Sequence, residues 1–119
     1  MAEYIANCES GVYCYKRRVF VNRRFEGHEK AQAGVLDVKN GTRLVSYETV
    51  VAEVIDGWLH VYGLWGRTTR THIGWYMREY GLTYGIAKEC YDSNVELNVE
   101  TGEVRGAKEK PIVTVGTCL

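Results

Sequence analysis

The chain has 119 residues, 45% of them hydrophobic and 12% aromatic, and its basic and acidic side chains balance to a formal net charge of zero. This composition excludes intrinsic disorder and predicts a single domain over residues 1–119, because two separate cores would be cramped at this length. No apolar run approaches the roughly 18 residues that a membrane-spanning helix needs, and residues 1–10 lack the basic start and apolar core of a secretory signal, so we expect a cytoplasmic protein.

The N-terminal part of the chain predicts extended structure. Residues 12–25 (VYCYKRRVFVNRRF) are rich in β-branched and aromatic side chains, which favours a strand or a bent pair of strands. Residues 26–34 (EGHEKAQAG) predict a short helix or a turn. Gly34 and the pair Asn40-Gly41 then indicate breaks.

Residues 44–65 carry the clearest local signal. Two β-rich runs flank Asp56-Gly57, a dipeptide that supplies the positive φ angles of a type I′ turn. The pattern therefore predicts a β-hairpin. Alternation places Val50, Ala52 and Val54 on one face of its first strand, with Leu59, Val61 and Gly63 alternating along the second.

The next segment changes its apolar period from two to about 3.6, which is typical of a helix. We predict a helix over residues 70–80, with Thr68 or Thr69 as the N-cap and Gly81 just after its end. Gly74 in its middle costs up to ~1 kcal/mol relative to Ala, which indicates close packing against a strand. The apolar stripe consists of Ile73, Tyr76, Met77 and Tyr80.

The remaining elements are strands. Residues 95–104 (VELNVETGEV) predict a strand, a turn at Thr101-Gly102 and a partner strand, and residues 111–115 (PIVTV) predict a last strand with Pro111 at its start. The fold class that follows is α+β: a mostly antiparallel sheet with one principal helix packed on it.

Four cysteines, Cys8, Cys14, Cys90 and Cys118, are candidate ligands of a structural zinc ion. If residues 9–13 close a tight hairpin, Cys8 and Cys14 lie opposite each other, and Cys90 and Cys118 complete a four-thiolate site by tertiary contact. Five intervening residues do not preset a zinc knuckle, so unrelated core thiols remain an alternative. Disulfides are a third reading, which a reducing compartment disfavours.

Charges are segregated along the chain. Between Gly11 and Arg24 there are five basic side chains and no acid, and between Glu89 and Val104 five acids and no base. The basic run predicts a contact surface for a partner, although a solvated face is equally compatible. Its aromatic neighbours also fit nucleic-acid binding, to which Arg67, Arg70 and Arg78 could add. The candidate partner-binding residues are Arg17, Arg18, Arg23 and Arg24.

No catalytic constellation is evident. The sequence has no phosphate-binding glycine loop and no HExxH spacing, and nothing marks a cysteine beside a histidine as an activated nucleophile. We therefore expect a protein that is not an enzyme.

Residues 46–81 carry the pattern S-Y-x-T, then a hairpin, then T-T-x-x-H-I opening a helix. This pattern resembles a small module in uncharacterised proteins of phages and mobile elements of gut Firmicutes. Chains of this kind include anti-CRISPR proteins, and this sequence is similar to an inhibitor of a type II CRISPR nuclease. Among such inhibitors, a zinc-containing one fits the four cysteines. The resemblance implies a location in the cytoplasm of a bacterial host, and it carries over no catalytic residues.

From the residues and the resemblance together we expect a non-enzymatic binding protein. It would bind a type II nuclease–guide complex, a protein partner, and block the loading of target DNA. A DNA-mimic version would use Glu96, Glu100 and Glu103 instead of the arginines. The alternative function is a nucleic-acid-binding accessory protein of a phage or plasmid.

Overall fold

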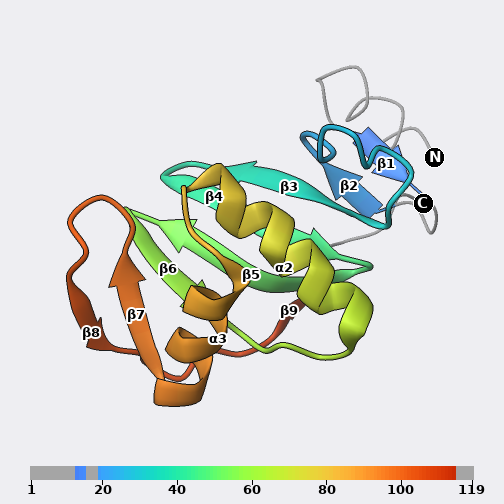
Figure 1. Cartoon of the computed structure of the whole chain (residues 1–119). Coiled ribbons are helices and arrows are strands. Elements are labelled where there is room, and N and C mark those ends of the chain that lie inside the picture. The colour runs from blue at the N-terminus through green and yellow to red at the C-terminus, as the bar shows by residue number, and fades with distance from the viewer. Residues whose placement is uncertain (1–12, 16–18, 115–119) are drawn as a thin grey trace.

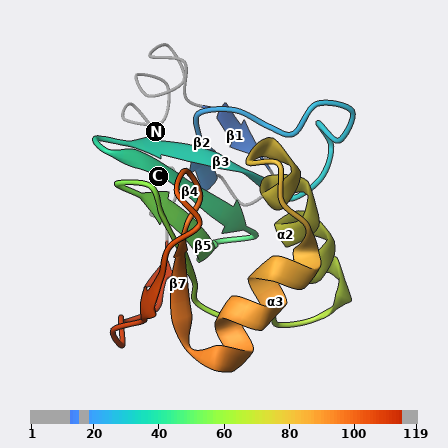
Figure 2. The same ribbon diagram turned by 60° about the vertical axis from the view of Figure 1, so that its left-hand side comes forward.

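The computed structural model describes residues 13–15 and 19–114 of the chain. Most of its strands form one seven-stranded antiparallel sheet, in the order β3-β4-β5-β6-β7-β8, with β9 paired to β5. Two helices, α2 (Arg67–Glu79) and α3 (Tyr84–Ser93), lie together on one face of this sheet (Figure 1; Figure 2). The predicted α+β class is confirmed, and the described residues contain two helices where one principal helix was expected.

The sheet is built from short antiparallel hairpins, and a separate two-stranded hairpin, β1–β2, lies beside β3 in Figure 1. The bounds are β1 Tyr13–Tyr15, β2 Val19–Val21, β3 Ala33–Val38, β4 Gly41–Ser46, β5 Thr49–Ile55, β6 Trp58–Val61, β7 Val95–Asn98, β8 Val104–Gly106 and β9 Val113–Thr114.

The predicted hairpins are confirmed where their turn chemistry is strong. Asp56 and Gly57 join β5 to β6 with φ angles of 53° and 86°, as a type I′ turn requires. The hairpin of β7 and β8 turns at Thr101-Gly102.

A bulge changes which side chains of β5 face the helices. The register between β4 and β5 shifts at Leu44/Val45, and Val51 is the extra residue. Ala52 and Val54 therefore pack with the helices, whereas Val50 lies in a second cluster with Val21 and Val45. The prediction that Val50 shares a face with Ala52 and Val54 was wrong because it assumed uninterrupted alternation.

Gly34 does not break the chain but lies within β3. A Cβ atom at this position would come within 2.7 Å of Val21 Cγ2 and 2.8 Å of the Arg23 carbonyl oxygen. The glycine is therefore needed because the segment around Val21 and Arg23 crosses β3 at close range, where Val35 exchanges backbone hydrogen bonds with Arg23.

Helix α2 begins three residues before the predicted start, with Gly66 as its N-cap. Neither threonine caps the helix, because Thr69 turns its hydroxyl toward the sheet instead. At the other end Gly81 adopts φ 71°, and the backbone N–H groups of Gly81 and Leu82 bond to the carbonyls of Arg78 and Met77, which confirms the predicted helix end.

Helix α3 was not predicted. It buries only Ala87 and Cys90, two positions three residues apart, so its apolar stripe is too short to show a clear period. The helix ends at Ser93, and its C-cap Asn94 adopts the left-handed conformation with φ 54°. Neither helix in the described part of the chain is long and apolar enough to cross a membrane.

Strand β4 holds α2 at two polar points. Near one end of the strand, Thr42 Oγ1 lies 2.6 Å from the Tyr76 hydroxyl and 2.7 Å from the Tyr80 hydroxyl. Near its other end, the buried Ser46 Oγ lies 2.8 Å from His72 Nδ1 and 3.1 Å from Thr69 Oγ1. The two halves of the pattern S-Y-x-T and T-T-x-x-H-I thus meet, and we call Ser46, Thr69 and His72 the serine clamp.

Replacing Ser46 with alanine tests the serine clamp. Ser46→Ala leaves His72 Nδ1 and the Thr69 hydroxyl buried without the serine partner, so we expect the free energy of unfolding to fall by about 1–3 kcal/mol. Urea denaturation followed by circular dichroism measures it. The control is Thr68→Ala, which removes an exposed hydroxyl from the same helix and is expected to leave stability unchanged or slightly higher. Equal stability of the two variants would contradict the clamp's role.

Candidate functional site

The outer face of α2 forms one side of a hollow of about 490 Å³. Because α2 buries Thr69, His72, Ile73, Tyr76 and Met77, the opposite face of the helix turns toward solvent. Tyr84, at the start of α3, forms the other side. We call this hollow the arginine groove; it is lined by Arg67, Arg70, Thr71, Gly74, Trp75, Arg78 and Tyr84.

The charge of the arginine groove is uncompensated. Its lining includes three arginines and no acidic residue of the described chain. Within residues 13–15 and 19–114, no carboxylate forms an ion pair with the guanidinium of Arg67, Arg70 or Arg78. Several other cations of the molecule, such as Arg43 and Arg105, do lie against carboxylates. The groove is therefore a local excess of positive charge on a chain of zero net charge.

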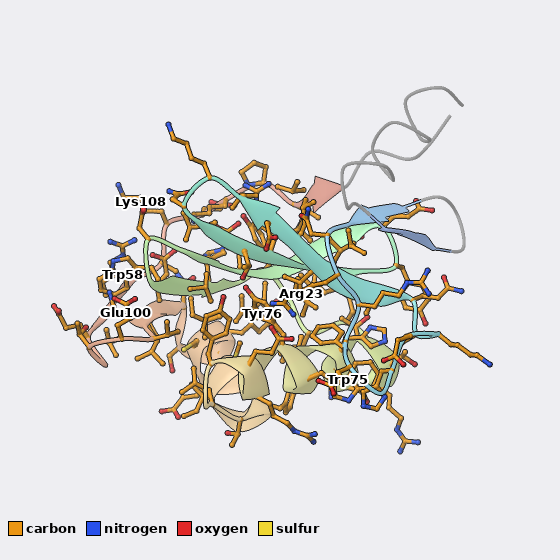
Figure 3. The ribbon with its side chains drawn as sticks, turned by 90° about the horizontal axis from the view of Figure 1, so that it is seen from above. Arg23, Trp58, Trp75, Tyr76, Glu100 and Lys108 are labelled. Carbon is orange, nitrogen blue, oxygen red and sulfur yellow. The ribbon has the colours of Figure 1, made fainter. Side chains whose placement is uncertain are left out.

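Trp75 gives the groove an aromatic wall with a fixed orientation. The His28 ring stacks on the indole with ring centroids 3.8 Å apart and an interplanar angle of 12°. Phe25 and His72 pack at an angle against the same indole, at 5.6 Å and 5.2 Å between centroids. Figure 3 shows Trp75 on the helix side of the sheet, away from the end where Trp58, Glu100 and Lys108 lie.

Gly74 lies between Arg70 and Arg78 on the same ridge of α2, because residues four apart in a helix share a face. A Cβ atom there would meet Tyr84 Cβ at 3.8 Å, which is ordinary van der Waals contact. The expected packing of Gly74 against a strand was wrong, since its neighbour belongs to α3.

The arginines predicted to bind a partner are only partly described. Arg23 donates two hydrogen bonds to Glu79, at 2.8 Å and 2.6 Å, and this pairing raises the pKa of Arg23. Arg24 donates to the backbone carbonyl of Glu29. Arg17 and Arg18 lie outside the described residues. The structure thus ties Arg23 to α2, and contact of these four arginines with a partner stays a prediction.

The cysteine prediction is also only partly described. Cys14 lies in β1 opposite Phe20, and Cys90 is buried in α3. Both ribbon views place β1 and α3 at opposite ends of the molecule (Figure 1; Figure 2). Cys8 and Cys118 lie outside the described residues. A structural zinc ion on the four thiols stays a prediction, and the described residues contain no group of three or more His, Cys, Asp or Glu side chains suited to a metal.

The Cys90 thiol itself is a poor nucleophile. Burial, and then the charge of Glu89, raise its pKa, so the thiol stays protonated near neutral pH.

A second polar cluster lies on the sheet face that the helices leave open. The register places one charged or polar residue from each of five neighbouring strands in a row: Arg43, Glu53, His60, Glu96 and Arg105. We call this row, with Lys110, the charge ladder.

The two carboxylates of the charge ladder are buried and share cations. Lys110 Nζ lies 3.0 Å from Glu53 Oε2 and 3.6 Å from Glu96 Oε2. His60 Nδ1 lies 2.9 Å from Glu96 Oε2, and Arg105 Nε lies 2.8 Å from Glu96 Oε1. Because Glu96 is only 3% exposed, it is not available to act in a DNA-mimic surface with Glu100 and Glu103.

Burial sets the protonation of the two histidines in these clusters. Burial lowers the pKa of His72. Burial, followed by the charge of Lys110, lowers the pKa of His60, and the neighbouring Glu96 opposes this only in part. For Glu96, burial alone would raise the pKa, but the hydrogen bond from Arg105 and the charge of Lys110 together outweigh it and lower the pKa.

Among the described residues, the arginine groove is a surface whose charges are free to meet a partner. The carboxylates of the ladder are paired with its cations, whereas the arginines of the groove meet no carboxylate of the described residues. From the sequence, Arg67, Arg70 and Arg78 were expected only as additions to the basic stretch. Their spacing along the predicted helix, compared with the spacing of its buried apolar stripe, could have shown that they lie on the solvent-exposed face of the helix.

The profile of a family of unknown function (DUF8033) matches residues 15–93, which contain the serine clamp and the whole arginine groove. No curated protein matches the chain, and no solved structure matches it.

Lys110 links the two buried carboxylates, and its removal tests the charge ladder. Lys110→Ala leaves Glu53 and Glu96 without their shared ammonium, and because that ammonium is partly exposed we expect the free energy of unfolding to fall by about 1–2 kcal/mol. Lys108→Ala, which removes an exposed lysine two residues earlier, is the control for chemical denaturation. An equal effect of both variants would contradict the network.

Stability is also expected to depend on pH through His60 and His72. Both have a lowered pKa when folded, so below about pH 6.5 the unfolded chain binds more protons than the folded chain. The free energy of unfolding therefore falls as the pH is lowered from about 7.5 to about 5, above the range in which most carboxylates titrate. Urea denaturation at several pH values measures this, and His60→Gln should flatten the curve. A stability that is constant over this range would contradict the burial of neutral histidines.

Proposed function

The chain belongs to this family of unknown function, and from its structure we propose that it is a non-enzymatic binding protein whose contact surface is the arginine groove. The observation that carries the proposal is the set of three unpaired arginines around a hollow without acidic lining. Exposed guanidinium groups without an internal partner are available to a partner at little cost in folding free energy.

The side-chain types of the groove favour binding. Arginine and tryptophan are enriched at interfaces, since both offer a large apolar area with polar atoms at defined positions. The guanidinium also binds carboxylates and phosphates through paired hydrogen bonds. The partner surface that complements this groove is anionic.

The resemblance supplies a more specific form of the proposal. An anti-CRISPR inhibitor would place this groove against a type II nuclease–guide complex and block target-DNA loading. The positive charge of the groove supports contact with an anionic part of that complex. A structural zinc on Cys8, Cys14, Cys90 and Cys118 would stabilise the fold and has no part in the contact. The nucleic-acid-binding accessory protein of a phage or plasmid, the alternative, would act without a nuclease.

Charge reversal within the groove tests the proposal. Arg70→Glu and Arg78→Glu should each weaken binding to a guide-loaded type II nuclease by about tenfold or more, and reduce inhibition of target cleavage in parallel. Both side chains are exposed and unpaired within the described chain, so folding should be unaffected.

The matched control is Lys39→Glu, which makes the same charge change at the exposed turn between β3 and β4. It should bind like the unaltered chain. If Arg70→Glu and Arg78→Glu also bind like the unaltered chain, the groove is not the contact surface.

A further inference from the structure

Gly74 occupies a position where packing does not require a glycine. At Gly34 a side chain would collide with Val21 Cγ2 at 2.7 Å, whereas a Cβ atom at Gly74 would find its nearest neighbour at 3.8 Å. Gly74 is also absent from the residues with positive φ, so its conformation is open to any amino acid. A glycine at this position weakens the middle of α2 without any gain in internal packing.

The absence of a side chain at Gly74 leaves open space on the helix surface between Arg70 and Arg78. Arg70, Gly74 and Arg78 follow one another along a single ridge of α2, and eight residues of helix separate the outer two by about 12 Å. Any larger side chain at Gly74 would project into the groove that these arginines flank. The position therefore favours a ligand whose own backbone passes closely over the helix.

We infer that the arginine groove binds the sugar–phosphate backbone of a single-stranded polynucleotide, which runs along α2 over Gly74. This inference rests on the proposed function and names the chemistry of the contact. Arg70 and Arg78 bind phosphates on either side of Gly74, and Arg67 adds a third cation. At about 3.4 Å of rise per stacked nucleotide, the 12 Å between the outer positions corresponds to on the order of three to four nucleotides.

The aromatic side chains favour a single strand over a duplex. Trp75 and Tyr84 line the same groove as the arginines, and the stack on His28 holds the indole in place. A base can stack on such a ring only when the face of the base is free. Base faces are free in a single strand but are covered by neighbouring base pairs in a duplex. A polyacidic peptide would pair with the arginines but has no aromatic ring to stack on Trp75 or Tyr84.

Fluorescence anisotropy with labelled oligonucleotides tests the inference on the full chain. The probes are one mixed-sequence RNA strand, the DNA strand of the same sequence, its duplex and a polyglutamate peptide. We expect binding to the single strands, weaker binding to the duplex and none to the peptide. Arg70→Ala and Arg78→Ala should each lower the salt dependence of single-strand binding by about 0.7 in the log–log slope.

Gly74→Gln tests the effect of the open space at Gly74 on binding without changing the charge of the groove. The substitution leaves the net charge unchanged and fills the space between the arginines, so we expect at least about tenfold weaker binding to the single strands. Its melting temperature should be equal to or above that of the unaltered chain, because glutamine favours the helix. Gly74→Ala, which adds only a methyl group, should weaken binding less than Gly74→Gln does, and Lys39→Ala, outside the groove, should bind as the unaltered chain does.

The outcomes distinguish this inference from the function it rests on. If the chain binds a nuclease–guide complex through Arg70 and Arg78 but binds no free strand, the proposed function stands and the polynucleotide inference is overturned. Binding of the peptide in place of the strands, equal binding of the duplex, or strand binding that Gly74→Gln leaves intact would each overturn it as well. If neither the complex nor the strands depend on the groove arginines, both proposals fail.

Discussion

The seating of α2 on β4 is the constraint on which the rest of the structure depends. Thr42, Leu44 and Ser46 alternate along the strand and so present a polar, an apolar and a polar side chain to the helix. The outer two bond to Tyr76 and to His72, while the buried Leu44 lies in the helix-side core. A rotation or a one-turn slip of the helix would break both polar contacts together and leave buried groups without partners. Apolar packing alone tolerates more variation.

The position of α2 on β4 also determines which side chains of the helix face solvent. Because the buried stripe of α2 is held in one orientation, the ridge of Arg70, Gly74 and Arg78 has one orientation as well. The functional proposal thus depends on the half-buried Thr42 and the buried Ser46 of β4 as much as on the exposed arginines. The match of the family profile to residues 15–93 covers both the anchors and the ridge.

The two faces of the sheet use charge in opposite ways. On the open face, the charge ladder brings Glu53 and Glu96 into contact with cations from β4, β8 and the segment after β8. Buried carboxylates are tolerated only when each has such partners, so these cations are committed to the fold. On the helix side, the groove arginines form no ion pair with a carboxylate of the described residues.

The sequence predicted those elements whose signal is local. The Asp56-Gly57 turn and the stripe of Ile73, Tyr76 and Met77 are examples, because turn chemistry and helical period act within a few residues. The bulge at Val51 and the short stripe of α3 left no such signal. The residues of the serine clamp were noted in the sequence, but their contact could not be predicted, because Ser46 and His72 lie 26 positions apart in the chain.

The candidate site was harder to predict because pairing is a tertiary property. Arg23 and Arg67 look alike in the sequence, yet Arg23 meets Glu79 from 56 residues away and Arg67 meets no carboxylate of the described chain. Only the folded arrangement separates a structural cation from one that is available to a partner.

The difference between paired and unpaired charges also explains how a chain with a near-neutral pI can bind an anionic ligand. A sequence pI near 6.8 lies below the usual range of nucleic-acid binders. That value counts every charge equally, whereas a ligand responds to the local potential, which falls off within about 8 Å at physiological salt. Glu53 and Glu96 are neutralised inside the charge ladder, and Glu79 is paired to Arg23. These acids lower the pI but contribute little to the field at the groove. A chain of zero net charge can therefore hold an anion on α2, because Glu53, Glu79 and Glu96 are paired with other cations, whereas the groove arginines meet no carboxylate of the described residues.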